Sequence, residues 1–168
     1  MKIQDRLKAG SVKRWNIVET TRQQTLAEHM FNVAMIAGEI AKLCPTVPVH
    51  TVYAWAIQHD LEEVILGDIP TPTKAKMLEL GFDYKKLSDA VWDKPNVDSS
   101  IRKIVKMADR MEALWFIQEH GIGRHAQLVE KRMRETFNES LNGQQTHSTL
   151  KAAAEEVWAS IVRGDIEI

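Results

Sequence analysis

The sequence has little cysteine, since Cys44 is the only one among its 168 residues. One thiol cannot form an intramolecular disulfide, so we interpret Cys44 as a core thiol in a protein that works in a reducing cytosol. No stretch has the roughly 20 apolar residues that span a bilayer. The first residues, MKIQDRLKAG, also lack the apolar run of a signal peptide. We therefore expect a soluble, cytoplasmic protein without a membrane partner.

An excess of either charge is also missing, because 22 Lys and Arg residues balance 23 Asp and Glu residues. A nearly neutral chain has no global attraction to nucleic acid, so we expect no nucleic-acid partner. Any specialised charge must then be local. The sequence shows no internal repeat, low-complexity tract or linker, and its length allows one sizeable core. We predict a single domain over residues 1–168.

No stretch alternates apolar and polar residues for long enough to predict a β-strand, whereas helical spacing of apolar residues is widespread. Thr25 followed by Glu28 has the pattern of a capping box, and Asp98 and Ser99 are candidate N-caps. Gly67 suits a left-handed C-cap before the stiff loop DIPTP. We predict an all-α bundle of six or seven helices. The main helices are expected at residues 25–44, 51–66, 84–92, 99–120, 124–141 and 148–163.

Polar groups that can bind a metal interrupt the apolar segment AIQHDLEEVILGDIPTP, residues 56–72. On one continuous helix, Glu63 lies at i+4 from His59 and at i+3 from Asp60, so the three side chains share a surface. Burying carboxylates without a partner is costly, which favours a cation or dedicated hydrogen bonds. Glu62 is rotated from Glu63 by about 100°, and we expect it to be a solvated or salt-bridged acid.

Two residues on other predicted helices complete a candidate ligand set, namely His29 after the capping box and Asp109 within KIVKMADRMEALW. Each alone has a simpler interpretation. His29 could be a hydrogen-bonded core histidine, and Asp109 could pair with a neighbouring Lys or Arg. Together with His59 and Asp60 they supply two imidazoles and two carboxylates, a mixed shell that suits Zn, Mn, Fe or Co. The apolar neighbours of Asp109 are interpreted as core: Met107, Met111, Leu114 and Trp115.

The ordered motifs AEH, HDLEEVILGD and KMAD, with KRWNIV before the first histidine, resemble those of HD-domain phosphohydrolases. The resemblance covers roughly residues 10–120. It points to the 5'-deoxynucleotidase (YfbR-like) branch and to the related phage dATP triphosphohydrolases (DatZ-like). It implies an HD-type helical fold and a divalent metal, Zn, Co or Mn, with room for a second ion, Mg²⁺, on the phosphates. The implied metal ligands are His29, His59, Asp60 and Asp109.

The same resemblance implies roles around the metal. Glu63 would position or deprotonate the attacking water, and Asp68 would be a second catalytic acid lining the site. The implied substrate-binding residues are Arg14, Lys74 and Lys106 for the phosphates, and Trp15 and Ile17 for the sugar and base. Solvated surface is the alternative for the cations, and plain core is the alternative for Trp15.

Hydrolysis at the α-phosphorus would release phosphate from a deoxynucleoside monophosphate and triphosphate from a triphosphate, and the same cations would serve either. The short chain and its opening KRWNIVETTRQQTLAEH look more like the compact phage enzymes, so we predict a dATP triphosphohydrolase. A 5'-deoxynucleoside monophosphate phosphatase and a catalytically silent nucleotide sensor are the alternatives. The resemblance also implies a homo-oligomer, a dimer or hexamer, in the host cytoplasm if the source is a phage. The C-terminal helices could supply its interface or close the core.

Overall fold

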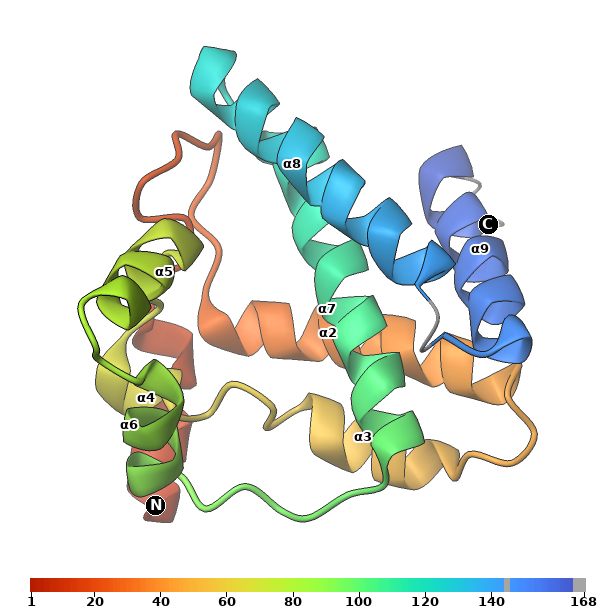
Figure 1. Cartoon of the computed structure of the whole chain (residues 1–168), viewed down its shortest axis with the longest axis horizontal. Coiled ribbons are helices and arrows are strands. Elements are labelled where there is room, and N and C mark those ends of the chain that lie inside the picture. Colours follow the sequence, from red (N-terminus) through yellow and green to blue (C-terminus); the bar gives the residue numbers. More distant parts are fainter. Residues whose placement is uncertain (144–145, 165–168) are drawn as a thin grey trace.

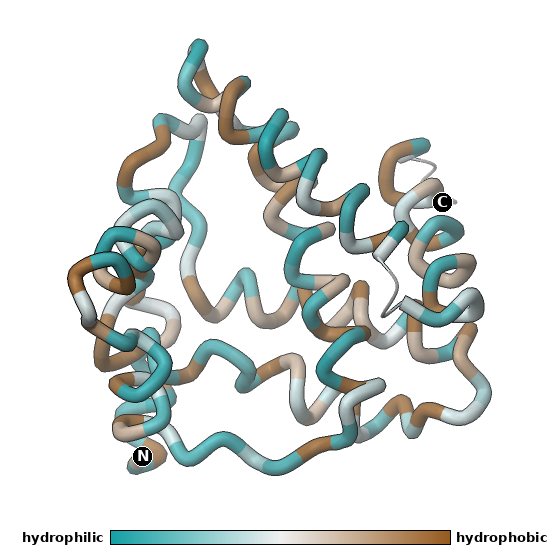
Figure 2. Tube along the Cα trace, in the orientation of Figure 1, coloured by the Kyte–Doolittle hydropathy of each residue, from teal (hydrophilic) through white to brown (hydrophobic). Residues whose placement is uncertain are grey.

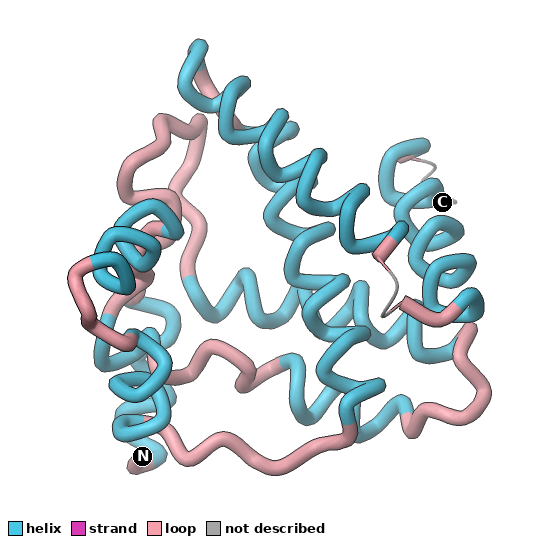
Figure 3. Tube along the Cα trace, viewed as in Figure 1, coloured by secondary structure: helices cyan, strands magenta, loops and turns pink. Residues whose placement is uncertain are grey.

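The computed structural model describes residues 1–143 and 146–164 and builds them from helices and loops (Figures 1 and 3). In chain order the elements are α1 (Ile3–Arg6), the 3₁₀ helix η1 (Leu7–Ser11), α2 (Leu26–Lys42), α3 (Val49–Ala56), α4 (Glu63–Leu66), α5 (Thr71–Glu79), α6 (Tyr84–Val91), α7 (Ser99–His120), α8 (Gly123–Asn142) and α9 (Ser148–Arg163). Within these ranges the only β-type pairings are two isolated bridges. The all-α prediction is confirmed, and no helix in the described part is long and apolar enough to cross a membrane.

The described residues form nine α-helices instead of six or seven. Two of the additional helices, α1 and α4, have only four residues each. α4 is the last turn of the helix predicted at residues 51–66, which the structure divides in two, whereas α1 is too short for an apolar period to show in the sequence. The third, α5, buries none of its side chains and so has no apolar stripe. It carries Pro72 in its first turn, where the missing N–H costs no hydrogen bond. The predicted loop DIPTP therefore ends at Pro70.

The helices that carry His29 and Asp109 begin at side-chain caps, as predicted. The Thr25 hydroxyl accepts a hydrogen bond from the Glu28 N–H at 3.2 Å, at the start of α2. The Asp98 carboxylate accepts one from the Ser100 N–H at 2.7 Å, at the start of α7. Such a cap typically contributes about 1 kcal/mol. Local sequence therefore fixes where α2 and α7 begin.

The centre of the molecule is formed by α2 and α7. α2 packs against α3 and α7, and α7 packs in turn against α8 (Figure 1). Met107, Met111 and Leu114 are buried, as predicted, whereas Trp115 is only half-buried. Brown and teal positions alternate along the helices in Figure 2, as expected when each helix turns one apolar face inward. Polar residues on the inner faces of α2 and α7 therefore need partners, and they mark the candidate site.

Two groups of helices flank this centre. α4, α5 and α6 gather near the N-terminus on one side, while α8 and α9 lie on the other (Figure 1). A small apolar cluster joins Ala9 and Leu26 to Leu61 and Trp92, and so holds the N-terminal segment against the chain after α3. Phe137 of α8 and the inner face of α9 belong to the main core, so these helices close the core. Cys44 is also buried, as expected for a core thiol.

Candidate metal centre and substrate site

α3 ends three residues before His59, so the continuous helix predicted for residues 51–66 is wrong. The chain instead makes tight turns, such as the one closed by the Glu63 N–H on the Asp60 carbonyl at 3.0 Å. The His59 ring gives the physical reason. Its Nδ1 donates to the Ala56 carbonyl at 2.7 Å, and so takes the acceptor that the Asp60 N–H would use in an α-helix. Because an i→i+3 turn follows, Asp60 and Glu63 still face the same region.

The four predicted ligand residues converge from three parts of the chain. His29 lies in the first turn of α2, His59 and Asp60 lie in the turns after α3, and Asp109 lies in the middle of α7. One nitrogen or oxygen atom from each lies within 4.8 Å of the others. The His29 Nε2 is 3.4 Å from an Asp109 oxygen, and the His59 Nε2 is 3.3 Å from an Asp60 oxygen. These distances are short enough for one ion to contact all four side chains.

The chemistry of this cluster fits a divalent transition-metal ion. The Nε2 atoms of His29 and His59 are buried and have no hydrogen-bond partner among the described residues. Both Nδ1 atoms are occupied elsewhere, so each ring turns its Nε2 toward the carboxylates. The side chains of Asp60 and Asp109 are 25% and 17% exposed, which leaves one side of the cluster open. Two imidazoles, two carboxylates and an open side are typical of a catalytic rather than a structural metal site.

The electrostatics of the cluster also favour a cation. Burial opposes ionisation of Asp60, but the neighbouring His59 outweighs it and lowers the Asp60 pKa below its usual value. Burial likewise opposes protonation of His29, yet its contacts with Asp109 and Glu112 raise its pKa to about 9. Without a metal, the negative charge of the carboxylates is thus compensated in part by a proton on His29. A divalent cation bound at the same place can displace that proton.

Glu63 lies beside the cluster and faces two cations. Its side chain is only 4% exposed, with Arg14 Nη1 at 3.5 Å and Lys74 Nζ at 3.3 Å from its carboxylate oxygens. Burial, reinforced by the charge of Asp60, raises its pKa to about 7 despite Arg14. A carboxylate that titrates near neutral pH can take a proton from water and release it again. The position and the pKa both suit the acid–base role predicted for Glu63.

The three predicted phosphate-binding cations surround the cluster to different depths. Arg14 is the most enclosed, with a side chain 12% exposed and Nη1 at 3.8 Å from Asp60. Lys74 is 32% exposed and reaches Glu63 from α5. Lys106 is 61% exposed and lies 2.7 Å from Asp109. Solvated surface is therefore a poor description of Arg14, while Lys106 forms an ion pair at the open rim of the site.

Asp68 and Ile17 lie in loops near these cations. Asp68 is half-buried between α4 and α5, and its carbonyl oxygen accepts a hydrogen bond from Asn16 Nδ2 at 3.2 Å. Burial opposes the Arg14 charge, but the Asp68 and Glu63 carboxylates raise the Arg14 pKa. Asp68 thus belongs to the acidic surroundings of Arg14. Ile17 is 53% exposed, so its side chain is free to meet a ligand.

Trp15 adopts a backbone conformation that is uncommon for a large residue, with φ at 63°. Its ring stacks on Phe116 with centroids 5.6 Å apart and planes 12° apart. Its indole N–H donates to the Gln24 side-chain oxygen at 2.9 Å. Unusual backbone angles persist only where surrounding contacts hold them, and they are common at functional sites. Trp15 is therefore held firmly beside Arg14, although it is also packed against the core.

Sequence reasoning missed Glu112, which is fully buried on α7. Its carboxylate accepts hydrogen bonds from His29 Nδ1 at 2.6 Å, Gln24 Nε2 at 2.6 Å and Asn32 Nδ2 at 3.1 Å. One available signal was its spacing, because an acid three residues after Asp109 lies on the same inward face of α7. A charged residue at a core position of a helix needs a partner, and here the partner is a candidate metal ligand.

Glu62 faces away from the cluster, and it is buried and salt-bridged rather than solvated. It is 5% exposed, and its carboxylate contacts Lys94 Nζ at 2.5 Å and Ser88 Oγ at 3.0 Å. Lys94 lies in the segment between α6 and α7, and Ser88 lies on α6. The salt bridge expected for Glu62 therefore exists and ties the turns after α3 to α6.

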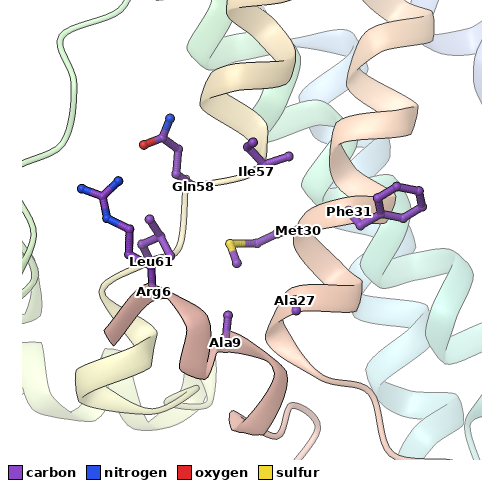
Figure 4. A pocket seen from close by; sticks show the side chains of 8 residues that line it. All are labelled: Arg6, Ala9, Ala27, Met30, Phe31, Ile57, Gln58 and Leu61. Atoms are coloured by element: carbon purple, nitrogen blue, oxygen red, sulfur yellow. The ribbon is translucent and has the colours of Figure 1, made fainter. Parts of the chain in front are cut away.

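An apolar pocket lies outside this site, between η1, α2 and the turns after α3. Its volume is about 370 Å³, and Figure 4 shows the side chains that line it: Arg6, Ala9, Ala27, Met30, Phe31, Ile57, Gln58 and Leu61. None of the predicted ligands or substrate-binding residues is among them. The pocket is thus distinct from the polar site.

A helical fold in which two buried histidines and two partly exposed aspartates converge beside a glutamate and several cations is typical of metal-dependent phosphohydrolases. A family profile described as 5'-deoxynucleotidase YfbR-like matches residues 2–94. The chain is 35% identical to a dATP triphosphohydrolase of Salmonella phage PMBT28 over 150 residues, which cover 82% of this chain and 77% of that protein. It is 32% identical to the dATP triphosphohydrolase of Cyanophage S-2L over 143 residues, covering 82% and 81% of the two chains.

A solved structure is similar over nearly the whole chain. It is the Cyanophage S-2L HD phosphohydrolase (DatZ) bound to dA and one catalytic Zn²⁺ ion, with a TM-score of 0.85, 25% identity and 98% coverage of both chains. The chain belongs to the YfbR-like family of HD phosphohydrolases. The predicted family and HD-type fold are confirmed.

Proposed function

We propose that this protein is a metal-dependent deoxynucleotide phosphohydrolase that converts dATP and water into deoxyadenosine and triphosphate. The main observation in support is the convergence of His29, His59, Asp60 and Asp109 beside the buried Glu63. The names of the phage relatives support dATP as the substrate, and the dA and Zn²⁺ in the similar structure support a nucleoside site next to a metal.

In the proposed reaction, water attacks the α-phosphorus and the bond between phosphorus and the 5'-oxygen breaks. The proton that Glu63 takes from the water is returned to the 5'-oxygen, which leaves as the hydroxyl group of deoxyadenosine. The four cluster residues would hold the divalent ion, Zn, Co or Mn. A bound ion supplies Lewis acidity toward water and phosphoryl oxygen. Glu63 accepts the proton of the attacking water, since it is the acid beside the cluster and burial raises its pKa to about 7 in the metal-free protein.

The remaining predicted residues bind and orient the substrate in this proposal. Arg14, Lys74 and Lys106 neutralise phosphate oxygens, and a second ion, Mg²⁺, could share that task. Asp68 remains the second acid lining the site in this proposal, and its carboxylate adds to the negative charge that surrounds Arg14. Trp15 and Ile17 frame the sugar and base from the loop that precedes α2.

Product analysis tests this function directly. The purified protein is incubated with dATP or dAMP and Co²⁺, Mn²⁺ or Zn²⁺, and inorganic triphosphate and phosphate are separated. We expect triphosphate from dATP, and no turnover after chelator treatment. The Asp109→Asn variant is the matched control, because it removes one ligand charge at nearly unchanged size. Hydrolysis of dAMP alone would support the second candidate, a 5'-deoxynucleoside monophosphate phosphatase, which the family description favours.

We also propose a homo-oligomer, a dimer or hexamer, in the cytoplasm of the host cell. Exposed apolar residues on α2 and after α3 support a contact between copies, since Phe31, Met35 and Ile57 are 61%, 45% and 53% exposed. Light scattering during size-exclusion chromatography measures the mass in solution. A monomer of 19.1 kDa at micromolar concentration would contradict the proposed assembly.

A further inference from the structure

A buried chain of hydrogen bonds connects the candidate metal centre to the loop before α2. Gln24, His29 and Glu112 are each 0% exposed. Glu112 Oε2 accepts from His29 Nδ1 at 2.6 Å, while Glu112 Oε1 accepts from Gln24 Nε2 at 2.6 Å. The chain continues outward, because the other end of the Gln24 amide accepts the indole N–H of Trp15 at 2.9 Å.

The direction of every bond in this chain is determined by chemistry. An ionised carboxylate can only accept, so His29 must carry a proton on Nδ1, and Nε2, which faces Asp60 and Asp109, is the nitrogen left to bind a metal. An indole N–H can only donate, so the Gln24 oxygen must face Trp15 and its NH₂ must face Glu112. If the Gln24 amide were reversed, its NH₂ group would face the indole N–H of Trp15, and its oxygen would face the carboxylate of Glu112.

We propose that Glu112 and Gln24 are positioning residues that set His29 for metal binding and Trp15 for the substrate through one hydrogen-bonded chain. The inference rests on the proposed metal-dependent function. A carboxylate that accepts the second N–H of a ligand histidine fixes the tautomer and the ring orientation, and increases its strength as a ligand. Phe116 adds a second link, since it lies one helical turn after Glu112 on α7 and stacks on Trp15.

The first test is the Glu112→Gln variant. A glutamine offers one acceptor where Glu112 offers two, so at least one donor among His29, Gln24 and Trp15 loses its partner. We expect the Zn²⁺ affinity, measured by chelator competition on the folded metal-free protein, to fall roughly 10- to 100-fold. Glu119→Gln is the matched control, because it removes the same charge from an exposed position of α7 and should leave the affinity unchanged.

A double exchange provides the rescue. In the Gln24→Glu/Glu112→Gln protein, the new amide at 112 can accept from His29 and donate to the new carboxylate at 24, which can still accept from Trp15. The net charge and the bonds that link His29, position 112, position 24 and Trp15 are restored, while the Asn32 amide, which donates to Glu112 Oε1 in the unmodified protein, must turn its oxygen toward the new amide. We expect this protein to recover more than half of the lost Zn²⁺ affinity on a logarithmic scale.

A measurement on the unmodified protein covers the case in which the variants do not fold. Zinc-loaded protein with ¹⁵N-labelled histidine should show a slowly exchanging proton on the Nδ1 of His29. A proton on Nε2 instead would overturn the proposal, as would Glu112→Gln protein with unchanged affinity or a double exchange no better than the single one. Failure of the unmodified protein to bind zinc would instead overturn the proposed function, so the two failures are distinguishable.

Discussion

Exchange of Glu63 for glutamine tests whether Glu63 acts as the catalytic base or only contributes to folding stability. Glu63→Gln keeps the shape of the side chain but removes its capacity to take a proton. Its carboxylate faces Arg14 and Lys74, yet Arg14 also lies 3.8 Å from Asp60 and so keeps an acidic partner. The pKa of about 7 shows that burial already disfavours the charged form of Glu63. We therefore expect little loss of folding stability, about 1 kcal/mol or less.

The expected loss of activity is much larger. A positioned acid–base group typically contributes 10²- to 10⁴-fold to the rate, so kcat of Glu63→Gln should fall by roughly that factor. This corresponds to about 2.7 to 5.4 kcal/mol of transition-state stabilisation. Zn²⁺ affinity should stay within a few fold of the unmodified protein, because Glu63 is not one of the four clustered ligand candidates.

Glu62→Gln is the matched control, since it makes the same chemical change at the adjacent buried position. Glu62 contacts Lys94 and Ser88 and faces away from the cluster. Breaking this pair should destabilise the fold by roughly 1 to 3 kcal/mol, because Lys94 is 30% exposed and the amide can still bond Ser88. Each kcal/mol lowers the melting temperature by roughly 2 to 4 °C in a chain of this size. kcat below the transition should be unchanged.

The assay measures kcat for dATP, Zn²⁺ affinity and melting temperature on the same preparations of both variants. Glu63→Gln should have a low kcat and a nearly unchanged melting temperature. Glu62→Gln should have an unchanged kcat and a lower melting temperature. Loss of zinc from the Glu63→Gln protein would make Glu63 a ligand and refute its assignment as the base. A fully active Glu63→Gln protein would refute it equally.

Three further outcomes are expected. His59→Ala and Asp109→Ala should each abolish metal binding and turnover while circular dichroism shows nearly unchanged helix content, and a variant that keeps both would contradict the ligand assignment. Trp15→Ala should lower activity on the deoxynucleotide and raise relative activity on the ribonucleotide if the indole excludes a 2'-hydroxyl; an unchanged ratio with a large fall in melting temperature would show that Trp15 is only core. The pKa of His29 is raised to about 9 in the metal-free protein, so at neutral pH zinc must displace the proton on His29. Displacement of this one proton should make the Zn²⁺ affinity increase by about tenfold per pH unit between pH 6 and 9. An affinity that does not change with pH would contradict this.

Local sequence determined the helices that carry the site. The Thr25 cap and the apolar period after it fix α2, and the Asp98 cap with a similar period fixes α7. Capping and periodicity act within a few residues, so they are visible without a structure. The order of His29, the HD pair and Asp109 likewise predicted a four-residue cluster, which the structure brings together.

The structure decided the rest, through one local side-chain contact and two tertiary contacts. The helix break before His59 depends on a side chain that bonds the Ala56 carbonyl, and periodicity cannot show that competition. The burial of Glu62 depends on Lys94, which lies 32 residues further along the chain. The contact between the Glu112 carboxylate and His29 forms only because α7 packs against α2. The partners of Glu62 and Glu112 are distant in sequence, so the chemistry of these two acids was visible beforehand, whereas their contacts were set by packing.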